Sequence, residues 1–467
     1  MTRWLAVLLA LTPTAALAEP LTADDCVALA LRRSPRLAEV DADIHGYRAR
    51  LAEVESVYYP KLYALGWVAP MYTVHGSALT SDVERDYSAS AWGPYTHLEA
   101  TLAQPLYTFG RVAAGEEAAS QRVAVERARR RVVAAEVALE VRRLYYTRLY
   151  ALSMLPSLEA AERLVVEAEA TANEKYEAGT GEVTQPDLMR LVYGRVELTR
   201  FIRAARDGAE LADAALKHAM GLPADAPIEL AEDRLPDAGS DALPDLATLL
   251  RQAGERRPEW AQLDHGAKAA SALARAEQLA NAPVLLLAGT LSASWTPTRD
   301  DAANPYHYDP YNELVGGVAI AVKWDFDPAL AAARSDGAEA ISERVVALRA
   351  FAESGIPLQV SKARQEVARH RDLEALAREA VTATRRWMLF ASAAYKTGTG
   401  EARELVEGLV AYLQARRTHY EHLRDLLVAR AELRYAVGDD GPPAAPPDVP
   451  AGPPAGAHPG AEEIVHD

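Results

Sequence analysis

Apolar residues recur along this chain with two periods, one typical of helices and one typical of strands. Two segments of 67 residues, 111–177 and 328–394, consist almost wholly of helix formers, and shorter helical segments follow at 182–220 and 401–437. Within the last of these, apolar side chains share one face at coiled-coil-like spacing: Leu405, Leu409, Tyr412, Tyr420, Leu423 and Leu427. At ~1.5 Å per residue, each longer segment would extend about 100 Å. The pattern therefore predicts long paired helices.

Strand-like alternation appears in four other segments, at about 58–70, 94–107, 283–296 and 313–326. In the last of them one face carries apolar side chains, and the other carries small or polar ones. The apolar face consists of Val318, Ile320, Val322 and Trp324. About ten residues suffice for a tilted strand to cross a bilayer. The four segments are either membrane strands or soluble hairpins packed on helices, and the aromatic residues at their ends favour membrane strands.

The same order of segments occurs twice. Pro35 and Pro258 are 223 residues apart, and so are Pro60 and Pro283. An Ala-rich segment runs from Pro35 to Pro60 and a corresponding one from Pro258 to Pro283. We therefore divide the chain into two copies of one unit, 19–240 and 241–438, joined by a Pro/Asp-rich linker. Within the long helical segments Pro156 and Pro357 are expected to cause kinks rather than ends, because helical patterning resumes beyond each.

Both copies contain a similar glycine turn, "KYEAGTGEV" at 175–183 and "AYKTGTGEA" at 394–402. We expect Gly179 and Gly398 to adopt a positive φ that ends one helix and reverses the chain. The adjoining Thr180 and Thr399 are expected to cap the returning helices. A phosphate-binding loop is excluded, because the turns lack a trailing Gly-Lys-Ser/Thr and follow helices. These turns are predicted to be the tips of helical hairpins.

Composition and short motifs narrow the function. Residues 1–18 are predicted to be an export signal, with Arg3, an apolar core and a small-residue cleavage site. Cys26, the single cysteine, is expected to be a buried side chain. The net charge of −16 argues against a nucleic-acid partner, and the absence of hydrolase, metalloprotease and redox motifs argues against an enzyme. The Pro/Ala/Gly-rich tail, 439–467, is predicted to be disordered.

Taken together, these segments resemble the outer-membrane efflux proteins of the TolC family. The resemblance is carried by "LTADDCVALALRRSPRL", "SVYYPKLYALG", "LAQPLYTFGR", both tip motifs and "LLVARAELRYAVG", and it covers nearly all of the mature chain. It implies a mainly α-helical protein with a membrane β-barrel, in which four strands per chain form a shared twelve-stranded barrel in a homotrimer. The barrel would lie in the outer membrane of a Gram-negative-type cell, in contact with lipid, and a tunnel of helical hairpins would continue into the periplasm.

The resemblance also implies a function without catalysis or cofactors. Such a protein is an exit duct of a tripartite efflux or type I secretion system, docked by a periplasmic adaptor protein that couples it to an inner-membrane transporter. The adaptor-docking residues carried over are Gly179, Thr180, Gly398 and Thr399. The other candidate from the sequence is a soluble periplasmic coiled-coil adaptor or scaffold, although we find no β-rich lipoyl-like segment of the kind such adaptors add.

Three residues match the pore gate of the family's best-known member: Tyr395, Glu404 and Glu407. Gly400 stands where that member has a gate arginine, and Gln185 stands where its first copy has an acid, so an acidic ring is expected without the ionic lock. Glu404 and Glu407 could equally form an ordinary solvated helix face. His419 and His422 have helical i, i+3 spacing, but no third ligand accompanies them in the sequence, so we predict solvated side chains and no metal site.

Overall fold

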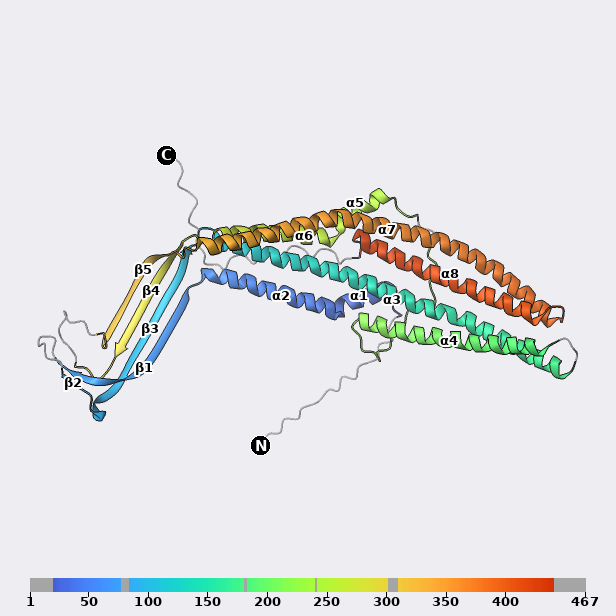
Figure 1. The fold of residues 1–467 in the computed structure, drawn as a ribbon, viewed down its shortest axis with the longest axis horizontal. Coiled ribbons are helices and arrows are strands. Elements are labelled where there is room, and N and C mark those ends of the chain that lie inside the picture. The colour runs from blue at the N-terminus through green and yellow to red at the C-terminus, as the bar shows by residue number, and fades with distance from the viewer. Residues whose placement is uncertain (1–19, 77–83, 180–182, 240–241, 301–309, 441–467) are drawn as a thin grey trace, which may run out of the picture. The chain divides into compact units, whose positions relative to one another are not determined.

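The computed structural model describes residues 20–76, 84–179, 183–239, 242–300 and 310–440. Helices and strands follow one another in this order: α1 (Ala23–Arg33), α2 (Pro35–Glu55), β1 (Lys61–His75), β2 (Glu84–Asp86), β3 (Trp92–Tyr107), α3 (Arg111–Glu177), α4 (Gln185–Ala219), α5 (Leu246–Arg256), α6 (Pro258–Gln278), β4 (Val284–Trp295), β5 (Glu313–Lys323), α7 (Pro328–Lys396) and α8 (Ala402–Val437) (Figure 1). The expected signal segment, 1–18, and most of the expected tail lie outside the described residues.

The element order repeats, and so do the element lengths. An 11-residue helix is followed by a 21-residue helix that begins at a proline, in α1 and α2 and again in α5 and α6. After the strands come helices of 67 and 69 residues, α3 and α7, and then helices of 35 and 36 residues, α4 and α8. The two long helices continue through Pro156 and Pro357. The sequence prediction that these prolines do not end the helices is confirmed.

The chain forms two compact units, and each is built from parts of both repeats. One unit contains the described residues up to 38, 130–258 and those from 355 on, and the other contains 39–129 and 259–354. The repeats therefore describe the order of elements along the chain, whereas the compact units describe which elements pack together.

The unit formed by 39–129 and 259–354 contains an antiparallel sheet with the strand order β2-β1-β3-β4-β5 (Figure 1). Four of the strands lie where the sequence predicted them. The three-residue strand β2 was not predicted. Strand β1 continues to His75 rather than ending near 70, because Met71 and Tyr72 still pair with β3 and Thr73–His75 pair with β2. Among the described strands, β5 pairs only with β4.

The strand register gives the sheet two different faces. Leu62 pairs with Leu102, Leu102 with Gly289, and Gly289 with Val318, so these residues share one face. Apolar residues occupy most of that face: Leu62, Ala64, Val68, Leu98, Ala100, Leu102, Leu287, Leu291, Ala293, Leu314, Val318, Ile320 and Val322. The opposite face carries most of the polar residues of these strands: Lys61, His97, Glu99, Thr101, Thr290, Ser292, Ser294, Glu313 and Lys323.

The other unit contains the parts of α3 from 130 on and of α7 from 355 on, which pair with α4 and α8 as two hairpins (Figure 1). Ion pairs join α3 to α4 in antiparallel register, with Glu169 on Arg195 and Glu159 on Arg206. Of the predicted apolar face of α8, the four leucines are buried and the two tyrosines are partly buried. Many of the buried residues are alanines, which allow helices to approach closely.

Two further predictions from the sequence concern the ends of this helical unit. Cys26 of α1 has no exposed surface, which confirms the buried side chain expected from the sequence. Asp440 was assigned to the start of the tail, yet its side chain is buried and lies 2.7 Å from Arg142, and Asp439 lies 2.9 Å from Arg256. The helical unit thus extends two residues further than predicted. Among the described residues no helix has the length and apolarity that a membrane crossing requires.

Candidate functional site: the hairpin tips

The α7–α8 tip is closed by backbone hydrogen bonds around Gly398, whose φ is 74°. The amide of Gly398 donates to the carbonyl of Tyr395 (3.1 Å), and the amide of Thr399 donates to the carbonyl of Ala394 (3.0 Å). These two bonds define a Schellman motif, which satisfies the last carbonyl groups of α7 and requires a left-handed residue. Because a side chain is rarely tolerated at such a φ, the helix end explains the glycine.

The α3–α4 tip has the same beginning. Gly179 has a φ of 66°, and its amide donates to the carbonyl of Tyr176 (3.1 Å). An added Cβ at Gly179 would meet no atom within 4 Å, so the φ angle rather than crowding favours glycine. The prediction of a positive φ at both tip glycines is confirmed. Thr180 lies outside the described residues.

The predicted role of Thr399 as a helix cap is wrong. Glu401 is the N-cap residue of α8, and the Thr399 hydroxyl donates back to the carbonyl of Ala394 in α7 (3.3 Å). In α4 the amide of Thr184 donates to the Asp187 carboxylate (3.1 Å), and the Thr184 hydroxyl also donates to it (2.5 Å). These hydrogen bonds hold the pKa of Asp187 below its usual range. Each returning helix thus begins two or more residues beyond the threonine that the sequence suggested.

Tyr395 connects the two hairpins. Its side chain is only 9% exposed and belongs to an apolar cluster that includes Ala168 and Leu405. The Tyr395 hydroxyl donates to the carbonyl of Ala168 in α3 (3.4 Å), and burial raises its pKa. A second link lies beside it, where Lys396 pairs with Glu167 (3.0 Å). Tyr395 therefore joins the ends of α3 and α7.

Glu404 and Glu407 both lie on the exposed surface of the first turns of α8. The Glu407 carboxylate accepts a hydrogen bond from the Nε of Arg403 (2.7 Å), one helical turn earlier. Gly400, at the position of the family's gate arginine, closes the turn tightly: an added Cβ would lie 2.8 Å from the Cβ of Ala394. A side chain at position 400 therefore requires a different turn.

The prediction of solvated side chains for His419 and His422 is wrong. The His419 side chain is 14% exposed, and its Nδ1 lies 3.3 Å from the Glu374 carboxylate of α7. His422 lies beside His370, also on α7, with 5.9 Å between ring centroids. The sequence offered His370 no signal, since 49 positions separate it from His419 and only the packing of α7 on α8 brings them together.

No family model and no curated protein matches the chain. Solved structures do match. A membrane protein from Pseudomonas aeruginosa has 19% sequence identity and a TM-score of 0.71, over 89% of this chain and 93% of that one. The outer membrane protein VceC of Vibrio cholerae has 14% identity and a TM-score of 0.70, over 89% and 96%.

The Campylobacter jejuni outer membrane channel CmeC adds a third match, with 14% identity and a TM-score of 0.71 over 91% of this chain and 87% of that one. The chain has the fold of the outer-membrane channels. For the fold, this confirms the resemblance that the sequence motifs carried. The matches cover about nine tenths of this chain.

Proposed function

We propose that the chain is an outer-membrane exit duct of a tripartite efflux or type I secretion system. Its strands would lie in the outer membrane, its helical hairpins in the periplasm, and a periplasmic adaptor and an inner-membrane transporter would complete the pathway. It would perform no catalysis. Its fold supports the proposal, and so does the observation that carries it most directly, the apolar face of the sheet.

That face is exposed as well as apolar. Val318 and Ile320, near the middle of β5, are 74% and 71% exposed, and Leu62 and Val68 of β1 are 69% and 68% exposed. A water-soluble protein rarely leaves so many large apolar side chains together on one surface. Lipid tails would remove them from water, while the polar side chains of the opposite face would line an aqueous channel.

The sheet edges support assembly from several chains. One edge of β5 has no partner among the described strands, and backbone groups left unpaired in lipid each cost several kcal/mol. Four long strands are too few to close a barrel around a channel. We therefore propose that copies of the chain pair edge to edge, and the family resemblance makes the number three, with twelve strands in all.

The hairpin tips are the proposed docking and gating region. Gly179 and Gly398 set exposed turns at the ends of both hairpins, where an adaptor could contact Thr180 and Thr399. Glu404 and Glu407 lie just beyond the second turn, and three copies would place six carboxylates around one axis. Tyr395, which ties α7 to α3, would hold the closed arrangement of the tips.

The test is fractionation of cells that produce the full chain, followed by mass measurement in detergent. We expect the protein in the outer-membrane fraction as a heat-sensitive trimer. A freely soluble periplasmic monomer would instead support the adaptor or scaffold alternative and refute the duct. A stable detergent-solubilised monomer or dimer from the outer membrane would contradict the trimer but leave the membrane location standing.

A further inference from the structure

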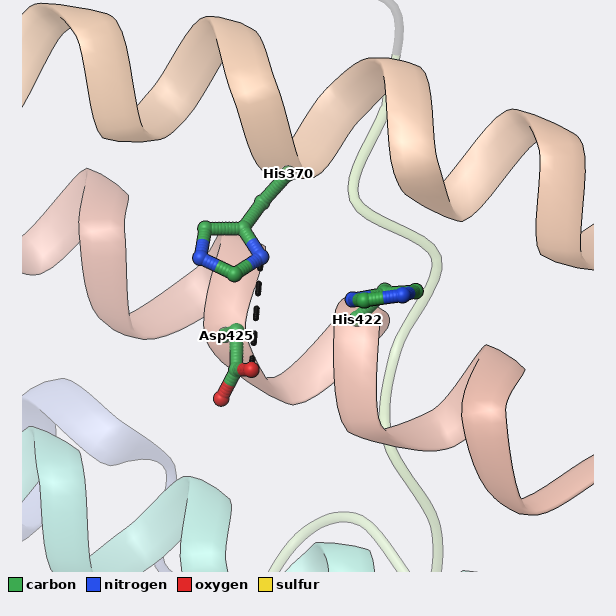
Figure 2. Close-up of side chains that lie close together, drawn as sticks. All are labelled: His370, His422 and Asp425. Carbon is green, nitrogen blue, oxygen red and sulfur yellow. Dashed lines mark ion pairs between the residues drawn. The ribbon is translucent and has the colours of Figure 1, made fainter.

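Two histidines and one aspartate gather between α7 and α8, away from the tips. His370 comes from α7, whereas His422 and Asp425 are one turn apart on α8. Figure 2 shows the His370 side chain extending toward Asp425, with His422 beside them. One potential ligand atom from each residue lies within 4.8 Å of the other two. All three residues belong to the same compact unit.

The two imidazoles have unused hydrogen-bonding atoms. Among the described residues, the Nδ1 atoms of His370 and His422 are buried and have no hydrogen-bond partner. The His370 residue as a whole is only 8% exposed, and its Nδ1 is 4.0 Å from the nearer oxygen of Asp425, beyond hydrogen-bonding distance. Leaving a buried polar atom unsatisfied costs about 1–3 kcal/mol. A ligand that accepts both nitrogen lone pairs would remove that cost.

The other ring nitrogen of His370, Nε2, faces Glu366 and Arg369. This atom lies 3.5 Å from the Glu366 carboxylate and 3.0 Å from the guanidinium of Arg369. In the present geometry the Arg369 guanidinium donates to Nε2, which places the proton of a neutral ring on Nδ1. Metal binding needs the other tautomer, in which Arg369 turns away, Nε2 donates to Glu366 and Nδ1 presents its lone pair toward Asp425. Glu366 then serves as the carboxylate that orients a ligating histidine.

The surrounding charges leave room for a cation. Arg369 is paired with Glu366, and its side chain is 57% exposed, so it can turn to solvent when Nε2 donates to the carboxylate. Arg424 contacts only one oxygen of Asp425, Oδ1, at 2.7 Å. The other oxygen, Oδ2, is the one that faces His370. Arg369 and Arg424 are therefore each paired with an acid, and one carboxylate oxygen of Asp425 stays available.

We propose that His370, His422 and Asp425 bind a divalent transition-metal ion of the zinc type. Two imidazoles and one carboxylate suit zinc, whereas calcium and magnesium prefer oxygen ligands alone. Tetrahedral zinc with bonds of about 2.0 Å places its ligand atoms about 3.3 Å apart, so side-chain rotation must close the present spacing. The fourth position would hold water. A bound ion would join α7 to α8 and strengthen their packing.

The experiment uses the full chain, purified in detergent and stripped of metal with a chelator. Zinc binding is measured by calorimetry, and Co²⁺ is used as a coloured substitute whose absorption reports tetrahedral coordination. We expect one zinc ion per chain, and at least about 100-fold weaker binding in His422→Gln, because loss of a mere orienting group already costs 10–100-fold. His218→Gln changes an exposed helical histidine in the same unit, and it should bind zinc like the wild type.

Asp425→Asn provides an independent variant that retains both histidines, in case His422→Gln does not fold. It should also weaken zinc binding, and zinc should raise the melting temperature of the wild type more than that of either variant. The proposal is overturned if the wild type binds no zinc, or if the His422→Gln and Asp425→Asn proteins bind it as tightly as the His218→Gln control. Because no transport is measured, failure here leaves the exit duct untouched.

Discussion

Replacing Val318 by arginine tests the assignment of the sheet to a membrane. Val318 is the central residue of β5, five positions from Glu313 and five from Lys323. Eleven residues at ~3.3 Å each give a strand of about 36 Å, which at a tilt of about 40° spans about 28 Å of membrane. That height is close to the thickness of a hydrocarbon core, so Val318 would lie near its middle.

The free-energy cost of an arginine at position 318 follows from that depth. An arginine on the lipid face of a membrane strand costs about 2–4 kcal/mol at the midplane and little near the interfaces. At 1.4 kcal/mol per tenfold change, Val318→Arg should lower the equilibrium for insertion by about 30- to 700-fold per chain. If three chains share the barrel, the assembly carries the change three times.

Ala319→Arg is the matched control, because Ala319 is the next residue of the same strand and pairs with Ala288 on the opposite face. Ala319 is exposed as well, so an arginine there would project into the aqueous channel rather than into lipid. Both variants place the same arginine side chain and the same charge at nearly the same depth. Only the face of the sheet distinguishes them.

The assay is refolding of each protein into phospholipid vesicles, with the membrane-inserted oligomer measured on unheated gels. We expect Ala319→Arg to insert nearly as well as the wild type and Val318→Arg to remain largely uninserted. Equal yields from the two arginine variants, or a greater loss in Ala319→Arg, would refute the assignment of the apolar face to lipid.

Three further predictions concern the helical unit. At the second tip, Gly398→Val should destabilise the turn by about 1–2 kcal/mol and abolish cross-linking to the adaptor. Gly398→Asn should retain the cross-linking, because asparagine tolerates a positive φ. Equal cross-linking by both variants would show that the tip is not part of the docking surface. A ring of carboxylates favours cations and is blocked by multivalent cations from the periplasmic side. In planar-bilayer recordings, the Glu404→Gln/Glu407→Gln channel should therefore lose both the cation preference and this block. Wild-type behaviour in the double variant would show that both glutamates are ordinary surface residues. Asp187→Asn should destabilise the start of α4 by about 1 kcal/mol. Since the pKa of Asp187 is held below 3.8, its carboxylate stabilises α4 fully above that pH, and the stabilisation is lost as pH falls through the lower folded pKa. The rate of proteolysis near Gln185 should therefore differ between Asp187→Asn and wild type at pH 7 and converge in acid. A difference that persists unchanged in acid would argue against the hydrogen-bonded carboxylate.

The long helices could be predicted from the sequence because their cause is local. Helix formers predominate from Arg111 to Glu177, and the structure ends α3 at that residue. The left-handed glycines were also visible, since a helix end has its own short signal. A positive φ was not predicted at Gly221 and Gly438, which follow α4 and α8 with φ values of 66° and 77°. Neither glycine lies in a motif that the two copies share.

Hydrogen bonds at the tips were less predictable. Thr399 follows a glycine, but the N-cap position of α8 is two residues later, at Glu401. The Thr399 hydroxyl therefore donates to the preceding helix rather than to the next one. That choice depends on how many residues the turn needs to reverse the chain. The short strand β2 escaped prediction for a related reason, since three residues show no alternation of their own and pair only because β1 extends beside them.

The sequence by itself determined the order of helices and strands and the alternation that makes one face of each strand apolar, because these depend on residues a few positions apart. Only the tertiary structure decided which faces combine. The strand register aligns four apolar rows into one surface, and the packing of α7 on α8 sets His370 beside His422 and Asp425. No period in the sequence records a contact between residues some fifty positions apart, since such a contact exists only once the chain has turned at Gly398 and folded back on itself.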